Sequence, residues 1–500
     1  MEKDRLILAI DQSTSATKAI LFDPAGRLCH RCDAGHPSFY PQPGWVGQDA
    51  EEIFRNTLQV IENVMKETGT SREQVQVLAL TNQRETVVVW DRHTGRPIDL
   101  AIGWQCRRAA EICKEIAGQG HGPLVKSRTG LVLSPYFSAA KISWLLDHVP
   151  GARVRAEQGD LLAGTMDSWL VWNLTGGQVH ATDYSNASRT QLFNLRELCW
   201  DEDLLRIFNI PATMMPRVLA SDTIFGTVDT ACGTAAGLPI AGIMGDSHAA
   251  LFGQNCFVPG MAKATYGTGS SIMMNIGVEP LESTRGLVTS IAWKQGDTVD
   301  YVFEGNINCT GASIKWLVDD LQLIQASREA GPLAASVDST DGVYLVPAFV
   351  GLGAPYWDSD ARAAITGMTR GTKKAHLVRA AEESIAYQIK DVLDLMMAES
   401  QTRVPELRTD GGPTRDAFLM QFQADILDTR VGCARIEELS AYGSCLMAGL
   451  AVGIWPDKAS LAAMREAGPV YMPAMDPATR ERLYQGWQEA VNRILTTRRS

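Results

Sequence analysis

Short apolar runs separated by small polar turns open the chain. Residues 6–10 form an apolar run that predicts a buried β-strand, and Asp11 stands at its end. The hydroxyl-rich segment 12–18 follows, and a second apolar run at residues 19–22 predicts another strand. Residues 23–26 place Pro at the second and Gly at the fourth position of a type I turn, so the chain is expected to return as a third strand. The pattern predicts a three-stranded meander.

The first turn of this meander has the composition of a phosphate-binding turn. Asp11 supplies a carboxylate at a strand end, and the segment beside it is rich in hydroxyls and small residues. Backbone N–H groups and hydroxyls of a tight turn can bind phosphate oxygens, and a carboxylate can bind the accompanying Mg²⁺. The alternative is a plain hairpin, because Ser and Thr are common in turns.

A related arrangement recurs in the second half of the chain. Residues 261–265 predict a strand that enters the turn 266–271, and residues 272–276 predict a strand that leaves it. A glycine-rich turn between strands is weak as a single signal. Its pairing with the first meander predicts an α/β protein of two similar domains that face one another across a cleft.

Two further strand ends carry candidate chemistry. An apolar strand at 239–244 ends at Asp246, which can accept a hydroxyl proton during phosphoryl transfer or can simply cap the helix that follows. Residues 408–423 combine a strand end, a glycine pair and a helix start, which let an adenine or a phosphate approach the backbone. A simple strand-to-helix turn is the alternative there. Residues 441–452 predict a helix that closes the second domain.

Arg84, Glu85 and Trp104 form the most informative local group. A polyol hydroxyl both donates and accepts hydrogen bonds, so a polyol site needs a cationic donor, an anionic acceptor and an apolar face. These three residues supply one of each. An ordinary surface Arg–Glu pair beside a core Trp is the alternative.

Composition limits the class of protein. A chain of 500 residues that is 45% hydrophobic predicts two domains, which we place at residues 1–254 and 255–500. The net charge of −11 argues against nucleic acid or an anionic membrane as a partner. No apolar run approaches the ~18 to 20 residues of a membrane span, and the first residues show no signal-peptide pattern, so the sequence predicts a cytoplasmic protein.

The ten cysteines are expected to be reduced thiols in packed positions. Cys29 and Cys32 resemble half of a redox or zinc motif. No second pair follows at metal spacing, and alternate residues of a strand face opposite ways. The sequence therefore predicts a structural role for these two cysteines.

Several further segments carry a family resemblance. They are residues 136–148, 182–190, 351–358, 367–371 and 381–388. With the segments above, they make the chain resemble the FGGY carbohydrate kinases over nearly its whole length, and most of all the members that phosphorylate glycerol. The resemblance implies two ribonuclease-H-like domains of the actin-like ATPase type, with ATP and Mg²⁺ in the cleft. It also implies a homo-oligomer, either a dimer or a tetramer.

The resemblance also implies roles for single residues. The acceptor hydroxyls are expected on Arg84, Glu85, Tyr136 and Asp246, with Trp104 against the carbon chain and Ser247 and Ser271 nearby. Asp246 is expected to be the general base and Asp11 to act on Mg²⁺. The phosphates of ATP are expected at Thr14, Ser15, Lys18, Gly267 and Thr268, and the nucleoside at Gly311, Lys315, Gly412 and Asp416.

Departures from the family pattern concern the acceptor. Ser247 and His248 stand where Gln is usual, and Ser271 stands where Phe is usual. Replacing Phe by Ser removes on the order of 100 Å² of apolar wall and adds a hydroxyl. The acceptor is therefore expected to be glycerol or, alternatively, a four- or five-carbon polyol or ketose of the erythritol, xylulose or ribulose type.

Two functions other than a kinase are also compatible with the sequence. An actin-like or chaperone-like ATPase would hydrolyse ATP without an acceptor, and it gives no role to Arg84, Glu85 and Trp104. A non-catalytic polyol sensor would not need Asp11, Thr14, Asp246 and Thr268, which phosphoryl transfer uses. The sequence favours in-line transfer of the γ-phosphoryl group to a terminal hydroxyl, with Asp246 accepting the proton.

Overall fold

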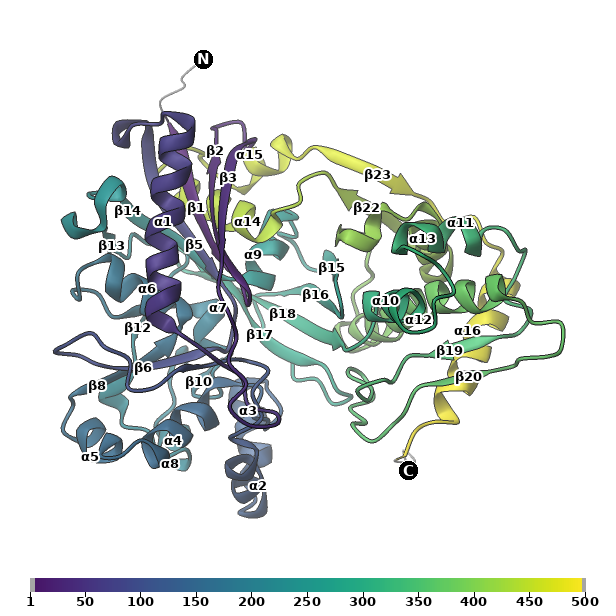
Figure 1. The fold of residues 1–500 in the computed structure, drawn as a ribbon, viewed down its shortest axis with the longest axis horizontal. Coiled ribbons are helices and arrows are strands. Elements are labelled where there is room, and N and C mark those ends of the chain that lie inside the picture. The colour runs from purple at the N-terminus through teal and green to yellow at the C-terminus, as the bar shows by residue number, and fades with distance from the viewer. Residues whose placement is uncertain (1–4, 497–500) are drawn as a thin grey trace.

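Two halves, each built around its own β-sheet, make up the molecule (Figure 1). This computed structural model describes residues 5–496. The N-terminal half contains a six-stranded sheet and the C-terminal half a seven-stranded sheet, with helices packed against both. The predicted α/β class is therefore confirmed.

The six-stranded sheet is centred on β1. Strand β1 pairs with β2 antiparallel on one side and with β5 parallel on the other. In spatial order the strands are β13 (Gly226–Thr227), β14 (Pro239–Gly245), β5 (Val75–Asn82), β1 (Leu6–Gln12), β2 (Ala16–Phe22) and β3 (Leu28–Gly35). The predicted meander is present, but its first turn is short, because the ladder continues to the pairs Asp11–Lys18 and Gln12–Thr17. Lys18 thus lies in strand β2 and not in the turn.

The seven-stranded sheet repeats this plan around β15. Strand β15 pairs with β16 antiparallel and with β21 parallel. In spatial order the strands are β17 (Val288–Gln295), β18 (Thr298–Ile307), β16 (Ser270–Gly277), β15 (Ala262–Tyr266), β21 (Glu406–Gly411), β22 (Arg430–Ala434) and β23 (Ala467–Tyr471). The predicted repeat of strand, turn and strand is therefore real, although Ser271 belongs to strand β16 and not to the turn.

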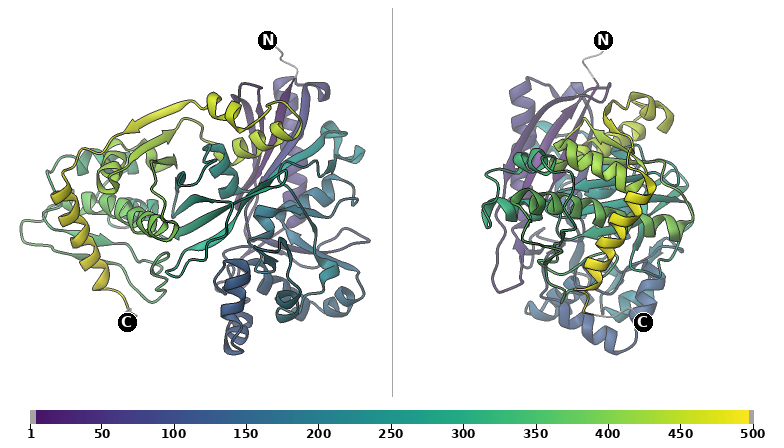
Figure 2. Two further views of the ribbon diagram at one scale, coloured as in Figure 1. Left: turned by 180° about the vertical axis from the view of Figure 1, so that it is seen from behind. Right: turned by 90° about the vertical axis from the view of Figure 1, so that its right-hand side faces the viewer.

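Helices pack on both faces of the N-terminal sheet. Helix α1 (Ala50–Thr68) begins at Asp49, whose carboxylate accepts the N–H groups of Glu51 and Glu52, and ends at Gly69 in the left-handed region. On the other face lie α9 (Asp246–Gly253) and α14 (Leu439–Ala451), which pack against each other. Helix α14 comes from the C-terminal half of the sequence, yet it contacts β1, β5 and β14. In the view from behind in Figure 2, yellow-green helices lie beside the purple strands of the first sheet.

The remaining elements surround these two layers. The other helices are α2 (Ala110–Gly118), α3 (Gly122–Thr129), α4 (Ser138–His148), α5 (Ala152–Glu157), α6 (Met166–Leu174), α7 (Tyr184–Ala187), α8 (Glu202–Ile207), α10 (Gly311–Asp319), α11 (Ala330–Ala334), α12 (Lys374–Ser400), α13 (Ala417–Leu427), α15 (Lys458–Met464) and α16 (Pro477–Asn492). The smaller sheets contain β4 (Gly47–Gln48), β6 (Val87–Asp91), β7 (Ala101–Ile102), β8 (Leu161–Thr165), β9 (Ala181–Asp183), β10 (Phe193–Asn194), β11 (Cys199–Trp200), β12 (Arg217–Leu219), β19 (Tyr344–Val346) and β20 (Ala364–Thr366). Within residues 5–496 no helix has the length and apolar composition needed to cross a membrane.

Candidate functional site

The carboxyl ends of β5 and β14 bring the predicted acceptor residues together. These strands are parallel neighbours whose register pairs Asn82 with Gly245. Arg84 follows the first strand, and Asp246 is the first helical residue after the second. The Nε of Arg84 lies 3.0 Å from Oδ1 of Asp246. Two residues 162 positions apart in the sequence therefore share one site because parallel strands end at the same edge.

Arg84 also binds a carboxylate from the other half of the molecule. Its two terminal nitrogens donate to the two oxygens of Glu304 in β18, at 3.0 and 2.9 Å. Both side chains are buried. Burial by itself raises the pKa of Glu304, but the guanidinium groups of Arg189 and Arg84 outweigh it and hold that pKa well below its ordinary range. Glu304 is therefore ionised at neutral pH.

Arg189 extends this contact into a chain of charges. Its Nε lies 2.6 Å from Glu85 Oε1, and its Nη1 lies 2.7 Å from Glu304 Oε2. We call the series Asp246, Arg84, Glu304, Arg189 and Glu85 the charge chain. Arg84 and Glu85 are joined through Glu304 and Arg189, deep in the protein, which excludes the alternative of a surface Arg–Glu pair.

Asp246 is the open end of the charge chain. Its side chain is 38% exposed, whereas those of the other four members are at most 5% exposed. The three carboxylates outnumber the two guanidinium groups, so one negative charge is left without a full counter-charge. The carboxylate of Asp246 faces open space, and its neighbour Arg84 is held in place by Glu304. This is the arrangement that a proton acceptor needs.

An aromatic wall lies beside the first turn. The ring centroids of Trp104 and Tyr136 are 5.6 Å apart in an edge-to-face contact. The indole Nε1 of Trp104 donates to Thr14 Oγ1 at 3.0 Å. This contact links the predicted acceptor wall to the predicted phosphate turn. The Thr14 hydroxyl accepts in it, so its own proton can still be donated to a phosphate oxygen.

Asp11 and Lys18 form a partly buried ionic pair at the same turn. Lys18 Nζ lies 3.5 Å from Asp11 Oδ2 and 2.7 Å from Glu438 Oε2. Burial raises the pKa of Asp11 to about 6, and the nearby carboxylates of Glu438 and Asp246 add to the rise. Oxygen ligands gathered in excess of their counter-charge suit a hard divalent cation such as Mg²⁺. Ser15 is exposed at the tip of the turn.

The predicted nucleotide residues of the C-terminal half line one cavity of about 1030 Å³. They are Gly267, Thr268, Gly311, Lys315, Gly412 and Asp416. The backbone N–H of Gly311 donates to Gly267 O at 2.9 Å, and a Cβ on Gly311 would lie 2.5 Å from that oxygen, so only glycine fits. The carboxylate of Asp416 caps helix α13 by accepting from Phe418 N and Leu419 N. A structural role for Asp416 is thus present beside the predicted binding role.

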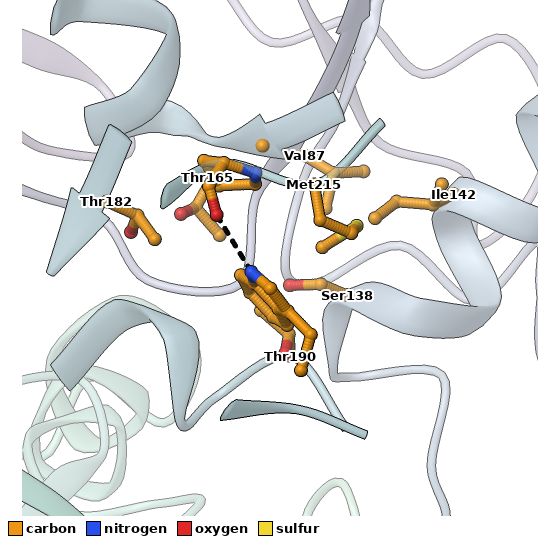
Figure 3. Close-up of a pocket in the computed structure, with 10 residues that line it drawn as sticks. Val87, Ser138, Ile142, Thr165, Thr182, Thr190 and Met215 are labelled. Carbon is orange, nitrogen blue, oxygen red and sulfur yellow. Dashed lines mark hydrogen bonds between the residues drawn. The ribbon is translucent and has the colours of Figure 1, made fainter. Parts of the chain in front are cut away.

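A much smaller cavity adjoins the backbone of the acceptor residues (Figure 3). Its wall includes Ser138, whose Oγ donates to Glu85 O at 3.3 Å, together with Thr165 and Thr190. Its volume of about 10 Å³ is roughly that of one water molecule. This cavity is too small to hold an acceptor.

Sequence reasoning missed three buried residues of this region. Glu304 lies in strand β18, and the signal that could have found it is an acid within an apolar run. Arg189 lies in the segment 182–190, which was noted only for its resemblance. Lys141 is fully buried and donates to Tyr136 O at 2.6 Å and to Glu85 O at 3.1 Å. It thereby fixes the backbone of Glu85, whose φ is 61°.

Lys141 gives a test by pH. Burial lowers the pKa of its ammonium to about 7, against smaller opposing contributions from Glu85, Cys106 and Cys113. Between this pKa and the ordinary value of 10.5, the unfolded chain binds more protons than the folded one, so the free energy of unfolding rises with pH. The free energy of unfolding of wild type, minus that of Lys141→Met, is expected to rise by up to about 1.4 kcal/mol per pH unit from pH 7 to 9. Urea denaturation measures both values. A constant difference across this range would contradict a depressed pKa.

The fold places the predicted nucleotide cavity in the C-terminal half and the Arg84–Asp246 contact of the predicted acceptor site in the N-terminal half. Models of the N-terminal and C-terminal domains of the FGGY family of carbohydrate kinases match residues 6–253 and 262–452. The chain belongs to this family. It is a phosphotransferase that acts on an alcohol group, with ATP and a small molecule as its substrates.

Individual relatives agree with this assignment. The chain is 50% identical to the glycerol kinase of Symbiobacterium thermophilum over 97% of this chain and 98% of the relative. It is 50% identical to that of Carboxydothermus hydrogenoformans over 98% of each chain. The solved structure of Plasmodium falciparum glycerol kinase with ADP has a TM-score of 0.94 at 36% identity and covers 99% of both chains. A gluconate kinase from Lactobacillus acidophilus, at 20% identity and a TM-score of 0.89 over 99% of both chains, shares the fold.

Proposed function

We propose that the protein phosphorylates a terminal hydroxyl of glycerol. The observation that carries the proposal is the contact of Arg84 Nε with Asp246 Oδ1 at 3.0 Å beside the Trp104–Tyr136 wall. A cationic donor, an anionic acceptor and an aromatic face then bind a short polyol. Full-length similarity to glycerol kinases supports the same acceptor.

In the proposed mechanism, Arg84 and Glu85 orient the acceptor and Asp246 takes the proton of the attacking hydroxyl. The turns at Thr14 and Thr268 present N–H groups and hydroxyls to the phosphates of ATP. Asp11 would hold Mg²⁺, which when bound neutralises charge on the transferred phosphoryl group. Residues 1–254 and 255–500 are proposed as the two domains whose closure excludes water. A cytoplasmic homo-oligomer remains a prediction from the sequence.

Ser271 supports a second candidate, a four- or five-carbon polyol or ketose. Its Oγ is buried and has no hydrogen-bond partner among residues 5–496. The β16–β18 register pairs Ser271 with Asn306, whose side chain donates to Glu304 Oε1 at 3.1 Å, so Ser271 lies on the sheet face that carries the charge chain. An additional substrate hydroxyl could satisfy this group.

A coupled ADP-release assay tests both candidates. Glycerol is expected to give the highest kcat/KM in a panel with dihydroxyacetone, erythritol, threitol, xylitol, ribitol, xylulose and ribulose. Ser271→Phe is expected to lower the use of the larger acceptors about 10-fold or more relative to glycerol, because it fills space in the pocket. A longer acceptor as the preferred substrate would replace glycerol in the proposal, and ADP release without any acceptor would support an ATPase instead.

A further inference from the structure

Strand β3 presents two potential metal ligands on one face. Cys29 is exposed and Cys32 is buried, so these cysteines face opposite ways, as the sequence predicts. His30 and Cys32 are two residues apart and therefore share a face of the strand. Helix α1 packs against this face, and Glu67 in its last turn lies 2.8 Å from His30 Nε2 through Oε2. Strand β3 thus supplies two of the potential ligands, and helix α1 supplies the third.

We propose that His30, Cys32 and Glu67 form a zinc site with water as the fourth ligand. One ligand atom of each residue lies within 4.8 Å of the others. Bonds of about 2.0 to 2.3 Å to zinc place tetrahedral ligands about 3.3 to 3.8 Å apart, so side-chain rotation alone closes the site. Cys32 is the fixed anchor because it is buried, whereas His30 and Glu67 are 38% and 55% exposed and can turn toward the ion.

The charges of these ligands balance the ion. Glu67 already accepts hydrogen bonds from His30 and Cys32, so the three ligand groups face one another. When the Sγ–Zn bond forms, the Cys32 thiol proton leaves to solvent, and thiolate, carboxylate and neutral imidazole then offset the two positive charges. A thiolate and an imidazole select zinc over magnesium, so the Mg²⁺ of a kinase assay does not compete for the site.

The site lies across the sheet from the predicted phosphate turn. Arg31, between the two β3 ligands, pairs with Glu438 at 2.5 Å on the α14 side, where Glu438 also binds Lys18. The zinc would join β3 to the end of α1 on the other side. We therefore expect it to stabilise the N-terminal half and not to take part in phosphoryl transfer.

Titration of the full chain with Co²⁺ as a spectroscopic probe tests the proposal. One equivalent is expected to bind, to produce a near-ultraviolet thiolate-to-cobalt band, and to be displaced by Zn²⁺. Cys32→Ser should remove the band, and Glu67→Gln should weaken binding at least about 10-fold. Cys29→Ser is the matched control, because it removes an exposed thiol three residues away, and it should leave the band unchanged.

Several results would overturn the proposal. Among them are cobalt binding without a thiolate band, a band that persists in Cys32→Ser, and a band lost in Cys29→Ser. Glu67 is exposed, so Glu67→Gln tests the site independently of any folding defect in Cys32→Ser, and wild-type affinity in that variant would also overturn it. None of the three ligands belongs to the charge chain, so each variant is expected to release ADP at the wild-type rate if it folds. ADP release at that rate therefore shows that the variant is folded.

Discussion

Asp246→Asn is expected to lower kcat by about 10²- to 10⁴-fold. The amide keeps the size of the carboxylate and can still accept a hydrogen bond from Arg84, but it cannot take the proton of the attacking hydroxyl. Asp246 is the only exposed member of the charge chain, so its replacement leaves the buried members in place. ATP binding, which is expected to depend on the cavity of the other half, should change little.

Turnover is measured by coupled ADP release and ATP binding by calorimetry. Asp49→Asn is a suitable control, because Asp49 caps α1 away from the charge chain and Asn caps helices equally well. This control should keep wild-type turnover and stability. Near-normal turnover in Asp246→Asn would rule out this residue as the general base.

Glu304→Gln is expected to damage both stability and acceptor binding. It leaves two buried guanidinium groups, those of Arg84 and Arg189, without their shared counter-charge, and breaking a buried pair in this way costs about 3 to 5 kcal/mol. Arg84 loses at least one of its two bonds to β18, because the amide nitrogen of Gln cannot accept a hydrogen bond, and it is held less firmly against Asp246. The KM for the acceptor should therefore rise, with a smaller change in the KM for ATP.

Denaturation curves and the two KM values check this prediction together. Glu382→Gln is the matched control for stability, since Glu382 is likewise buried but burial raises its pKa well above its ordinary value, whereas the pKa of Glu304 is lowered. The folded pKa of Glu304 is depressed, so the stability it contributes is present above the ordinary pKa of 4.5 and is lost as the pH falls further. Wild-type stability and an unchanged acceptor KM in Glu304→Gln would show that the charge chain does not position Arg84.

Local patterns were enough to predict the strands and turns around both sheet centres. Alternation of apolar runs with small polar turns predicted β1, β2, β15 and β16, because runs of about four to eight residues between turn signals are too short for a typical helix. The exact residues of each turn were predicted less well. Lys18 and Ser271 lie in strands because cross-strand pairing extends each ladder beyond the apolar residues.

The sequence by itself determined the α/β class and the repeated strand–turn–strand plan, since these depend on hydrophobic period and glycine placement within short segments. The predicted nucleotide residues came from the family resemblance, and the structure gathers those of the C-terminal half around one cavity. Only the tertiary structure decided the contacts between distant segments. Helix α14 packs on the first sheet because its almost fully buried surface needs an apolar partner, which the sheet supplies. Strand register brings Glu304 to Arg84 and Arg189, whose charges it neutralises. Helix packing brings Glu67 to His30 and Cys32. Neither contact follows from the spacing of these residues along the chain.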